Sequence, residues 1–278
     1  MDKSTLKRVL PIAVFILLLV PIITSSLLDL EKKRENELIQ QRILAEELAQ
    51  RKAWEAEEKN YLMGKFDQTQ KENFILIPSS QATNSEYKMY LRKEALEAFL
   101  QMQEAGRKDG IELKIASATR NFGYQKNIWN NKWNGIILVN GKNLAESIPN
   151  ELERFKKILE YSAVPGTSRH HWGTDIDINT ATPEYFNTDE GIKVYAWLVK
   201  NAPLFDFCQP YTLKGSDRPY GYFEEKWHWS YLPLAKTFTE EYKNLIKEED
   251  ISGFLGDKYV LGQDLINKQV LSINPDCL

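Results

Sequence analysis

Hydrophobic and polar positions divide the chain into three successive patterns. Residues 10–28 are uncharged and mostly aliphatic, and at 1.5 Å per residue a helix of this length just crosses a hydrocarbon core of roughly 30 Å. We therefore expect residues 1–28 to form an N-terminal membrane anchor. A cleavable signal peptide is the alternative, although no clear small-x-small cleavage site follows the segment, and both imply export from the cytoplasm.

Strong helix formers fill the second pattern, residues 29–68, which is rich in Glu, Lys, Gln, Ala and Leu and contains no proline. Leu38, Ala45 and Leu48 follow a heptad spacing, but the next step places Lys52 in the apolar stripe. We expect a solvated helical stalk with at most a weak coiled coil. A homodimer formed through this stalk is left open.

The third pattern covers residues 69–278, where aromatic residues, glycine, proline and short β-like runs occur together. Interleaved helices and short strands predict a single α+β domain. The expected strands include 74–77, 113–116 and 136–139, and the expected helices include 87–107, 149–161 and 188–200.

Composition and charge narrow the function classes. Apolar residues make up 42% of the 278 residues and charged residues 27%, which is ordinary for a globular protein. The net charge of −3 gives no electrostatic argument for a nucleic-acid partner. Cys208 and Cys277 are too few for a disulfide framework; they form either one bridge or two unpaired thiols.

Histidine is scarce, so any histidine-dependent chemistry must use His170, His171 or His228. Trp227 and Trp229 alternate with His228, so on a strand the imidazole points away from both indoles, toward a cleft. Glu225 lies three residues before His228 and reaches the same cleft only if the chain bends between them.

The stretch 174–178 also alternates and predicts a strand, with Asp175 and Asp177 on one face. Two neighbouring carboxylates repel, so one should have a raised pKa unless a cation neutralises them. Gly173 permits a sharp turn that would bring His170 toward Asp177.

Two histidines and one carboxylate with an open fourth position are the donor set of a catalytic zinc site. His170, Asp177 and His228 provide this set, and Glu225 would be the proton acceptor beside it. The structural alternatives are a surface strand with solvated aspartates and a histidine buried in the core.

A third polar segment follows the strand expected at 113–116. Arg120 in this segment would hold a carboxylate or a developing oxyanion through its planar guanidinium, or form a surface salt bridge. Residues 129–143, rich in Asn, Trp and Gly, either line the substrate pocket or form a surface loop.

These motifs resemble a known family. Ser-x-His-x-x-Gly-x-x-x-Asp at 168–177, Glu-x-Trp-His at 225–228 and Ser-x-x-Arg at 117–120 are similar to the zinc D-alanyl-D-alanine carboxypeptidases of the VanY type, over roughly residues 85–235. That family shares its fold, a small, mostly antiparallel sheet with flanking helices, with D-Ala-D-Ala dipeptidases, L-alanoyl-D-glutamate endopeptidases and the hedgehog signalling domain.

The resemblance implies a role for each matching residue. One zinc ion per chain would be held by His170, Asp177 and His228, with Glu225 as the general base and Arg120 at the scissile carbonyl oxygen. Ser168 and Gln125 would contact substrate. Asp175 would either contact substrate or orient a metal ligand. Lys226 stands where the family often has proline, and His171 has no counterpart with a known role.

The implied function is hydrolysis of the terminal peptide bond of peptidoglycan stem peptides. An L,D-carboxypeptidase or an endopeptidase with the same zinc site is the main alternative, and a non-catalytic cell-wall binding module is a more remote one. Together with residues 1–28, this implies a single-pass protein of the cell membrane with its catalytic domain on the extracytoplasmic side.

Overall fold

The computed structural model describes the backbone of residues 3–278 and the side chains of residues 24–278. The chain divides into two compact units, Met1–Ala56 and Glu57–Leu278. Helix α1 (Lys3–Leu62) runs through the first unit, and its last residues, 57–62, belong to the second unit. The side chains of residues 24–54 in this helix are all exposed. Among the residues described with side chains, no helix is long and apolar enough to cross a membrane. Most of the anchor predicted at 10–28 lies outside that part of the chain.

A four-stranded antiparallel sheet stands at the centre of the second unit, with strand order β3-β4-β6-β5. A separate two-stranded sheet pairs β1 with β2. The strands are β1 (Phe74–Leu76), β2 (Tyr90–Arg92), β3 (Ile115–Ser117), β4 (Asp175–Ile178), β5 (Phe207–Cys208) and β6 (His228–Tyr231). The predicted α+β class and antiparallel sheet are therefore confirmed.

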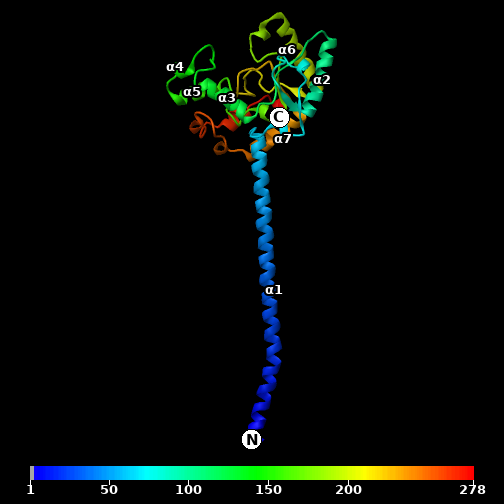
Figure 1. Cartoon of the computed structure of the whole chain (residues 1–278), viewed down its shortest axis with the longest axis vertical. Helices are drawn as coiled ribbons and strands as arrows, with labels where there is room; N and C mark the ends of the chain where they lie inside the picture. The colour runs from blue at the N-terminus through cyan, green and yellow to red at the C-terminus, as the bar shows by residue number, and fades with distance from the viewer. Residues whose placement is uncertain (1–2) are drawn as a thin grey trace. The chain divides into compact units, whose positions relative to one another are not determined.

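Helices α2 (Lys93–Lys108) and α6 (Asp189–Asn201) cover the apolar face of the central sheet. Ile176 and Trp229, paired across β4 and β6, lie in this cluster with Phe99 of α2. Helix α2 begins later than expected from the sequence, because residues just before it form β2. In Figure 1, α2 and α6 lie on one side of this unit and α3, α4 and α5 on the other.

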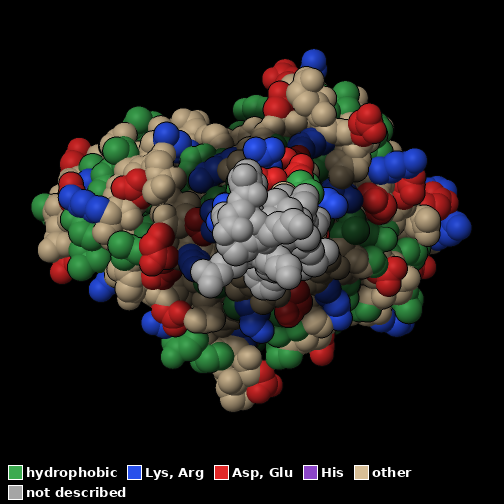
Figure 2. Space-filling model, turned by 90° about the horizontal axis from the view of Figure 1, so that it is seen from below, with side chains coloured by type: hydrophobic (Ala, Val, Ile, Leu, Met, Phe, Trp, Pro, Cys, Tyr) green, Lys and Arg blue, Asp and Glu red, His purple; other side chains and the backbone are tan. Residues whose placement is uncertain are grey.

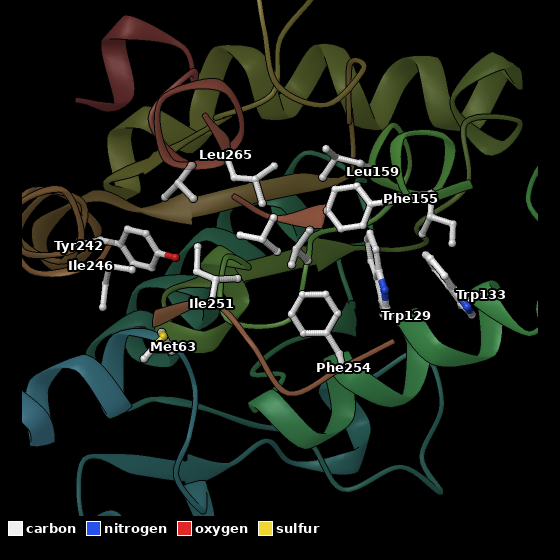
Figure 3. Close-up of a cluster of buried hydrophobic side chains, with 14 of the residues drawn as sticks. Met63, Trp129, Trp133, Phe155, Leu159, Tyr242, Ile246, Ile251, Phe254 and Leu265 are labelled. Atoms are coloured by element: carbon white, nitrogen blue, oxygen red, sulfur yellow. The ribbon is translucent and has the colours of Figure 1, made fainter. Parts of the chain in front are cut away.

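A second apolar cluster fills the region between the remaining helices: α3 (Phe122–Trp133), α4 (Leu144–Ser147), α5 (Glu151–Leu159) and α7 (Leu232–Leu245). Figure 3 shows Trp129 between Phe155 and Phe254, with ring centroids 5.3 and 5.7 Å away in edge-on contacts. Leu62 and Met63, at the end of α1, are buried in the same cluster. The compact unit therefore includes the end of the segment whose composition predicts a stalk.

The strand expected at 136–139 does not form. Ile136 and Leu138 are exposed, and Val139 pairs only with Lys142 across a tight turn. Asn140 and Gly141 both have positive φ in this turn. Residues 136–139 have the apolar composition of a strand, but no neighbouring strand is placed to pair with them. Composition alone therefore does not determine strand formation here.

Cys208 and Cys277 form a disulfide, with 5.7 Å between their Cα atoms. The bond attaches the C-terminal segment to edge strand β5 and decides between the two alternatives left by the sequence. Asn274 supports the same attachment, because its backbone N–H donates to the carbonyl of Pro210 at 2.8 Å.

Candidate active site

Three side chains converge on the polar face of the central sheet: His170, Asp177 and His228. One ligand atom from each lies within 4.8 Å of the other two. Asp177 Oδ1 is 3.3 Å from His170 Nε2 and 3.4 Å from His228 Nδ1. All three side chains are buried, and the two imidazole rings meet edge to face at 4.7 Å. The structure thus brings together the residues that the sequence assigned to a metal.

Strand register and one glycine produce this convergence. Asp177 on β4 lies directly opposite His228 on β6. His170 belongs to a short 3-10 helix that ends at Gly173, whose φ of 72° reverses the chain before β4. A Cβ at Gly173 would lie 2.3 Å from a ring atom of Phe74, so a larger residue would displace the turn. The turn expected at Gly173 is therefore observed.

Two of the atoms that face one another at this point, His170 Nε2 and Asp177 Oδ1, are both acceptors, which favours a cation between them. His170 Nδ1 lies 2.8 Å from the carbonyl oxygen of Ala118. A carbonyl can only accept, so Nδ1 carries the proton and Nε2 presents its lone pair. His170 Nε2 and Asp177 Oδ1 are buried without a hydrogen-bond partner. Two imidazoles and one carboxylate fit a zinc ion with an open coordination position.

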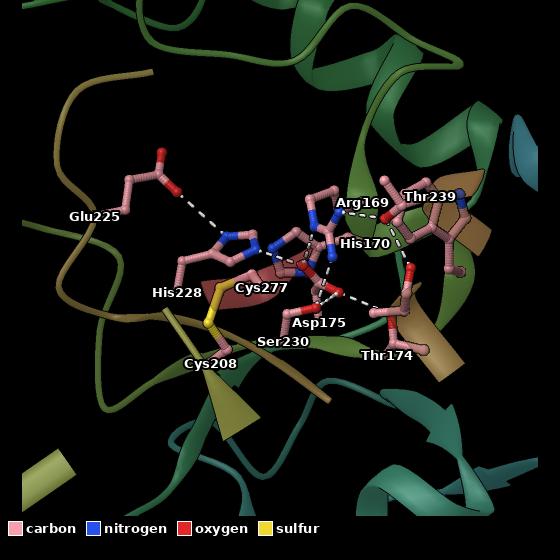
Figure 4. Close-up of polar contacts among 12 residues, drawn as sticks. Arg169, His170, Thr174, Asp175, Cys208, Glu225, His228, Ser230, Thr239 and Cys277 are labelled. Carbon is pink, nitrogen blue, oxygen red and sulfur yellow. Dashed lines mark hydrogen bonds and ion pairs between the residues drawn. A yellow bond between two sulfur atoms is a disulfide. The ribbon is translucent and has the colours of Figure 1, made fainter. Parts of the chain in front are cut away.

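Asp175 lies behind His228 rather than beside a substrate. Its Oδ2 accepts a hydrogen bond from His228 Nε2 at 2.8 Å, so Nδ1 of that ring faces the metal group. Its Oδ1 accepts from Thr174 and Ser230, both at 2.7 Å. The carboxylate is fully buried and does not line the cavity. Its assignment to substrate contact is therefore corrected to orientation of a ligand (Figure 4).

The guanidinium of Arg169 neutralises Asp175, one of the two neighbouring aspartates on β4. Its Nε donates to Asp175 at 3.0 Å, and its two terminal nitrogens donate to Thr239 at 3.0 Å and Ser230 at 2.9 Å. Burial would raise the pKa of Asp175, but Arg169 and His228 lower it below its usual range. The carboxylate is thus held charged inside the protein.

Neighbouring charges also determine the pKa values of two members of the metal group, His228 and Asp177. Burial would lower the pKa of His228, but hydrogen bonds to Asp175 and Glu225 raise it to about 9. Burial would raise the pKa of Asp177, yet His170 and His228 lower it to about 2. A metal-binding imidazole must be deprotonated, so a divalent cation would replace the proton on His228 Nδ1.

Glu225 reaches the metal group because the chain bends where the sequence required it to bend. The N–H of His228 donates to the carbonyl of Glu225 at 3.2 Å, which closes a turn immediately before β6. The carboxylate Oε2 then lies 3.2 Å from His228 Nδ1. Trp229 is buried in the core on the opposite face from His228, whereas Trp227 lies in the turn and lines the cavity.

A cavity of about 200 Å³ opens over these groups and is lined by Arg120, Gln125 and Ser168. Gln125 donates from Nε2 to the carbonyl of Ala163 at 2.7 Å, while its Oε1 is buried without a partner. Arg120 Nε is also buried without a partner. Both side chains keep polar atoms free to bind a ligand. Lys132 lines the same cavity and was not singled out from the sequence.

His171 connects two loops of the site from behind. Its Nδ1 donates to the carbonyl of Arg120, and its Nε2 accepts from the N–H of Gly166 at 3.0 Å. Burial lowers its pKa to about 3. A Cβ at Gly64 would lie 2.5 Å from His171 Nδ1, and the carbonyl of Gly64 accepts from the N–H of Phe122 at 2.7 Å. His171 is therefore a structural bridge outside the cavity.

Several residues that support the site carried weak signals or none in the sequence. Ser230 follows His228 by two positions on β6, so strand alternation could have placed it on the same face. Arg169 stands next to His170, but nothing in the motif assigns it to Asp175. Thr239 lies 70 residues from Arg169 and had no signal.

The surface gives a mixed electrostatic pattern. In Figure 2, Lys and Arg side chains are interspersed with Asp and Glu over the visible part of the described surface. The cavity contains the basic side chains of Arg120 and Lys132 together with the carboxylates of Asp177 and Glu225.

Comparison with known proteins agrees with the geometry. A family model described as VanY, D-alanyl-D-alanine carboxypeptidase, matches residues 88–234, just over half of the chain. An uncharacterized protein of Haemophilus influenzae is 29% identical over 117 residues, which cover 37% of this chain and 83% of that protein. A D-alanyl-D-alanine carboxypeptidase of Enterococcus faecalis is 28% identical over 151 residues, which cover 52% of this chain and only 50% of that protein.

Two solved structures are similar at 23% identity. The LdcB LD-carboxypeptidase has a TM-score of 0.47, covering 74% of this chain and 81% of its own. The zinc-bound D,D-pentapeptidase VanY of a VanB-type resistance cassette has a TM-score of 0.42, covering 67% of this chain and 89% of its own. The extent of the family match, together with the two histidines, the aspartate and the adjacent glutamate, shows that this chain belongs to the VanY family of D-alanyl-D-alanine carboxypeptidases, which are zinc metallopeptidases.

Proposed function

We propose that this protein is a zinc-dependent D,D-carboxypeptidase that removes the terminal D-alanine from peptidoglycan stem peptides. The observation that carries the proposal is the grouping of His170, Asp177 and His228 within 4.8 Å, with the Glu225 carboxylate 3.2 Å from His228. A bound zinc ion would supply a Lewis acid and lower the pKa of a water molecule.

The side chains around this group have separate roles in proton transfer, charge stabilisation and substrate binding. Glu225 accepts a proton from the attacking water and passes it to the leaving amine as the C–N bond breaks. Arg120 donates to the carbonyl oxygen as negative charge develops there. Gln125 Oε1, which has no partner, accepts a hydrogen bond from a substrate N–H. Ser168, at the cavity wall, contacts the bound peptide.

We also propose that the catalytic unit works on the extracytoplasmic side of the cell membrane, anchored by residues 1–28. The Cys208–Cys277 disulfide supports export, because such bonds persist in oxidising compartments and are rare in the cytosol. The apolar segment 10–28 supports an anchor by its length and lack of charge.

Purified muropeptides test the proposal directly. The detergent-solubilised full chain is incubated with pentapeptide and tetrapeptide substrates, with a chelator and after zinc is restored. Loss of one alanine from pentapeptides, stopped by the chelator and recovered with zinc, is the expected result. Loss of alanine from tetrapeptides alone would replace the D,D assignment with L,D, and internal cleavage would replace it with an endopeptidase. Absence of any chelator-sensitive product would refute the enzymatic proposal.

A further inference from the structure

Lys132 is a cation in the cavity for which the proposed chemistry has no role. It lies on helix α3 seven residues after Gln125 and four after Ile128, and all three side chains line the cavity. Residues at this spacing share one face of a helix. Lys132 is therefore presented to the same space as the substrate-binding glutamine, roughly 10 Å farther along the helix axis.

The surroundings of Lys132 leave its charge unneutralised. Among the residues described with side chains, its hydrogen-bond partner is the carbonyl oxygen of Tyr161, at the long distance of 3.5 Å. Burial and the charge of Arg120 lower the pKa of Lys132 to about 8, and Glu225 opposes this shift only in part. Glu225 itself is engaged with His228. The two carboxylates of the cavity, Asp177 and Glu225, both lie against His228, so neither neutralises Lys132 directly, which favours an anionic ligand group there.

The two cations occupy different positions relative to the metal group. The backbone of Arg120 is fixed beside it, because its N–H donates to the carbonyl of His170 and its own carbonyl accepts from His171. Lys132 starts from the far end of α3. Lys132 therefore lines the same cavity from a different position than Arg120, where it is available to a second charged group of the bound peptide.

We propose that Lys132 binds the C-terminal carboxylate of the substrate and thereby restricts hydrolysis to the last peptide bond. The inference rests on the proposed function, because it assigns chain-end recognition to that same cavity. An ammonium–carboxylate contact inside a cavity is a charge-assisted hydrogen bond, and a neutral carboxamide at the same place would lose most of it.

Binding of two ligands that differ only at their end tests this assignment. Acetyl-L-Lys-D-Ala-D-Ala is titrated as the free acid and as the C-terminal carboxamide into the zinc-loaded full chain carrying Glu225→Gln, which suppresses turnover. With Lys132 intact, the acid should bind about 10- to 100-fold more tightly than the amide. Adding Lys132→Met should remove that preference by weakening the acid alone. Lys132→Arg should retain much of it.

Lys126→Met is the matched control, because it removes the same charge from the same helix at a position that does not line the cavity. It should leave the acid preference unchanged. Equal weakening of acid and amide by Lys132→Met would assign Lys132 to the scissile carbonyl and overturn the inference, as would an absence of acid preference with Lys132 intact. Turnover by the unsubstituted protein is measured in parallel. A clear acid preference without cleavage would refute the proposed function and leave the carboxylate site standing.

Discussion

Replacing Asp175 with asparagine removes one buried negative charge while conserving the shape of the side chain. The substituted amide can keep its oxygen toward Arg169 and His228 and turn its nitrogen toward the hydroxyls of Thr174 and Ser230, which can accept as well as donate. The number of hydrogen bonds is thus conserved, so the difference between the variant and the parent reports the loss of the negative charge. Arg169, whose side chain is 0% exposed, is left without its counter-ion.

The expected costs appear in stability and in metal affinity. An uncompensated buried charge destabilises a protein by about 3 kcal/mol or more, so the free energy of unfolding of the metal-free Asp175→Asn variant should fall by at least that amount in urea. Because a carboxylate behind an imidazole strengthens it as a ligand, zinc affinity should fall about 10- to 100-fold in chelator competition. Asp217→Asn, an exposed control, should change neither quantity. A variant within 1 kcal/mol of the parent, with unchanged zinc affinity, would refute the role assigned to Asp175.

Three further expectations follow from the same geometry. Glu225→Gln should lower kcat by about 10²- to 10⁴-fold while zinc content, measured by atomic absorption, stays at one per chain; near-normal turnover would remove Glu225 as the base. Substituting both Cys208 and Cys277 with serine should lower the free energy of unfolding by about 4 kcal/mol in guanidinium, because the bond closes a loop with a sequence separation of 69 residues. No loss of stability would mean that the C-terminal segment is held by its other contacts. His171 is buried in its neutral form, because burial lowers its pKa to about 3. As the pH falls, this histidine therefore binds a proton in the unfolded chain at a higher pH than in the folded protein. The contribution of this histidine to the free energy of unfolding should therefore be constant above about pH 6.5. Between about pH 6.5 and pH 3 it should fall, by at most about 1.4 kcal/mol per pH unit. His171→Asn should reduce that slope, and an unchanged slope would assign the acid sensitivity to other residues.

Local patterns were sufficient to identify the centre of the site. Alternation in 174–178 placed Asp175 and Asp177 on one face of a strand, and Gly173 indicated the turn that brings His170 to them. A cleft shared by Glu225 and His228 requires a bend between them, and the structure contains this bend. Each of these inferences depends on residues only a few positions apart, where backbone geometry limits the outcome.

Contacts between distant segments could not be anticipated in the same way. Arg169 binds Thr239 on α7, and His171 packs on Gly64 just after α1, but no periodicity connects residues so far apart. The run 136–139 was apolar enough for a strand yet had no neighbour to pair with. The end of α1 had the composition of a solvated stalk, but tertiary packing buries Leu62 in the core.

We expect His170, Asp177 and His228 to hold one zinc ion. X-ray absorption at the zinc edge, measured on the purified full chain together with its zinc stoichiometry, tests this most directly. We expect one zinc per chain, with two imidazole nitrogens and a carboxylate oxygen at about 2.0–2.2 Å, and loss of this spectrum in Asp177→Ala. A chain that binds no zinc, or one whose zinc spectrum shows sulfur ligands or is unchanged in Asp177→Ala, would contradict it.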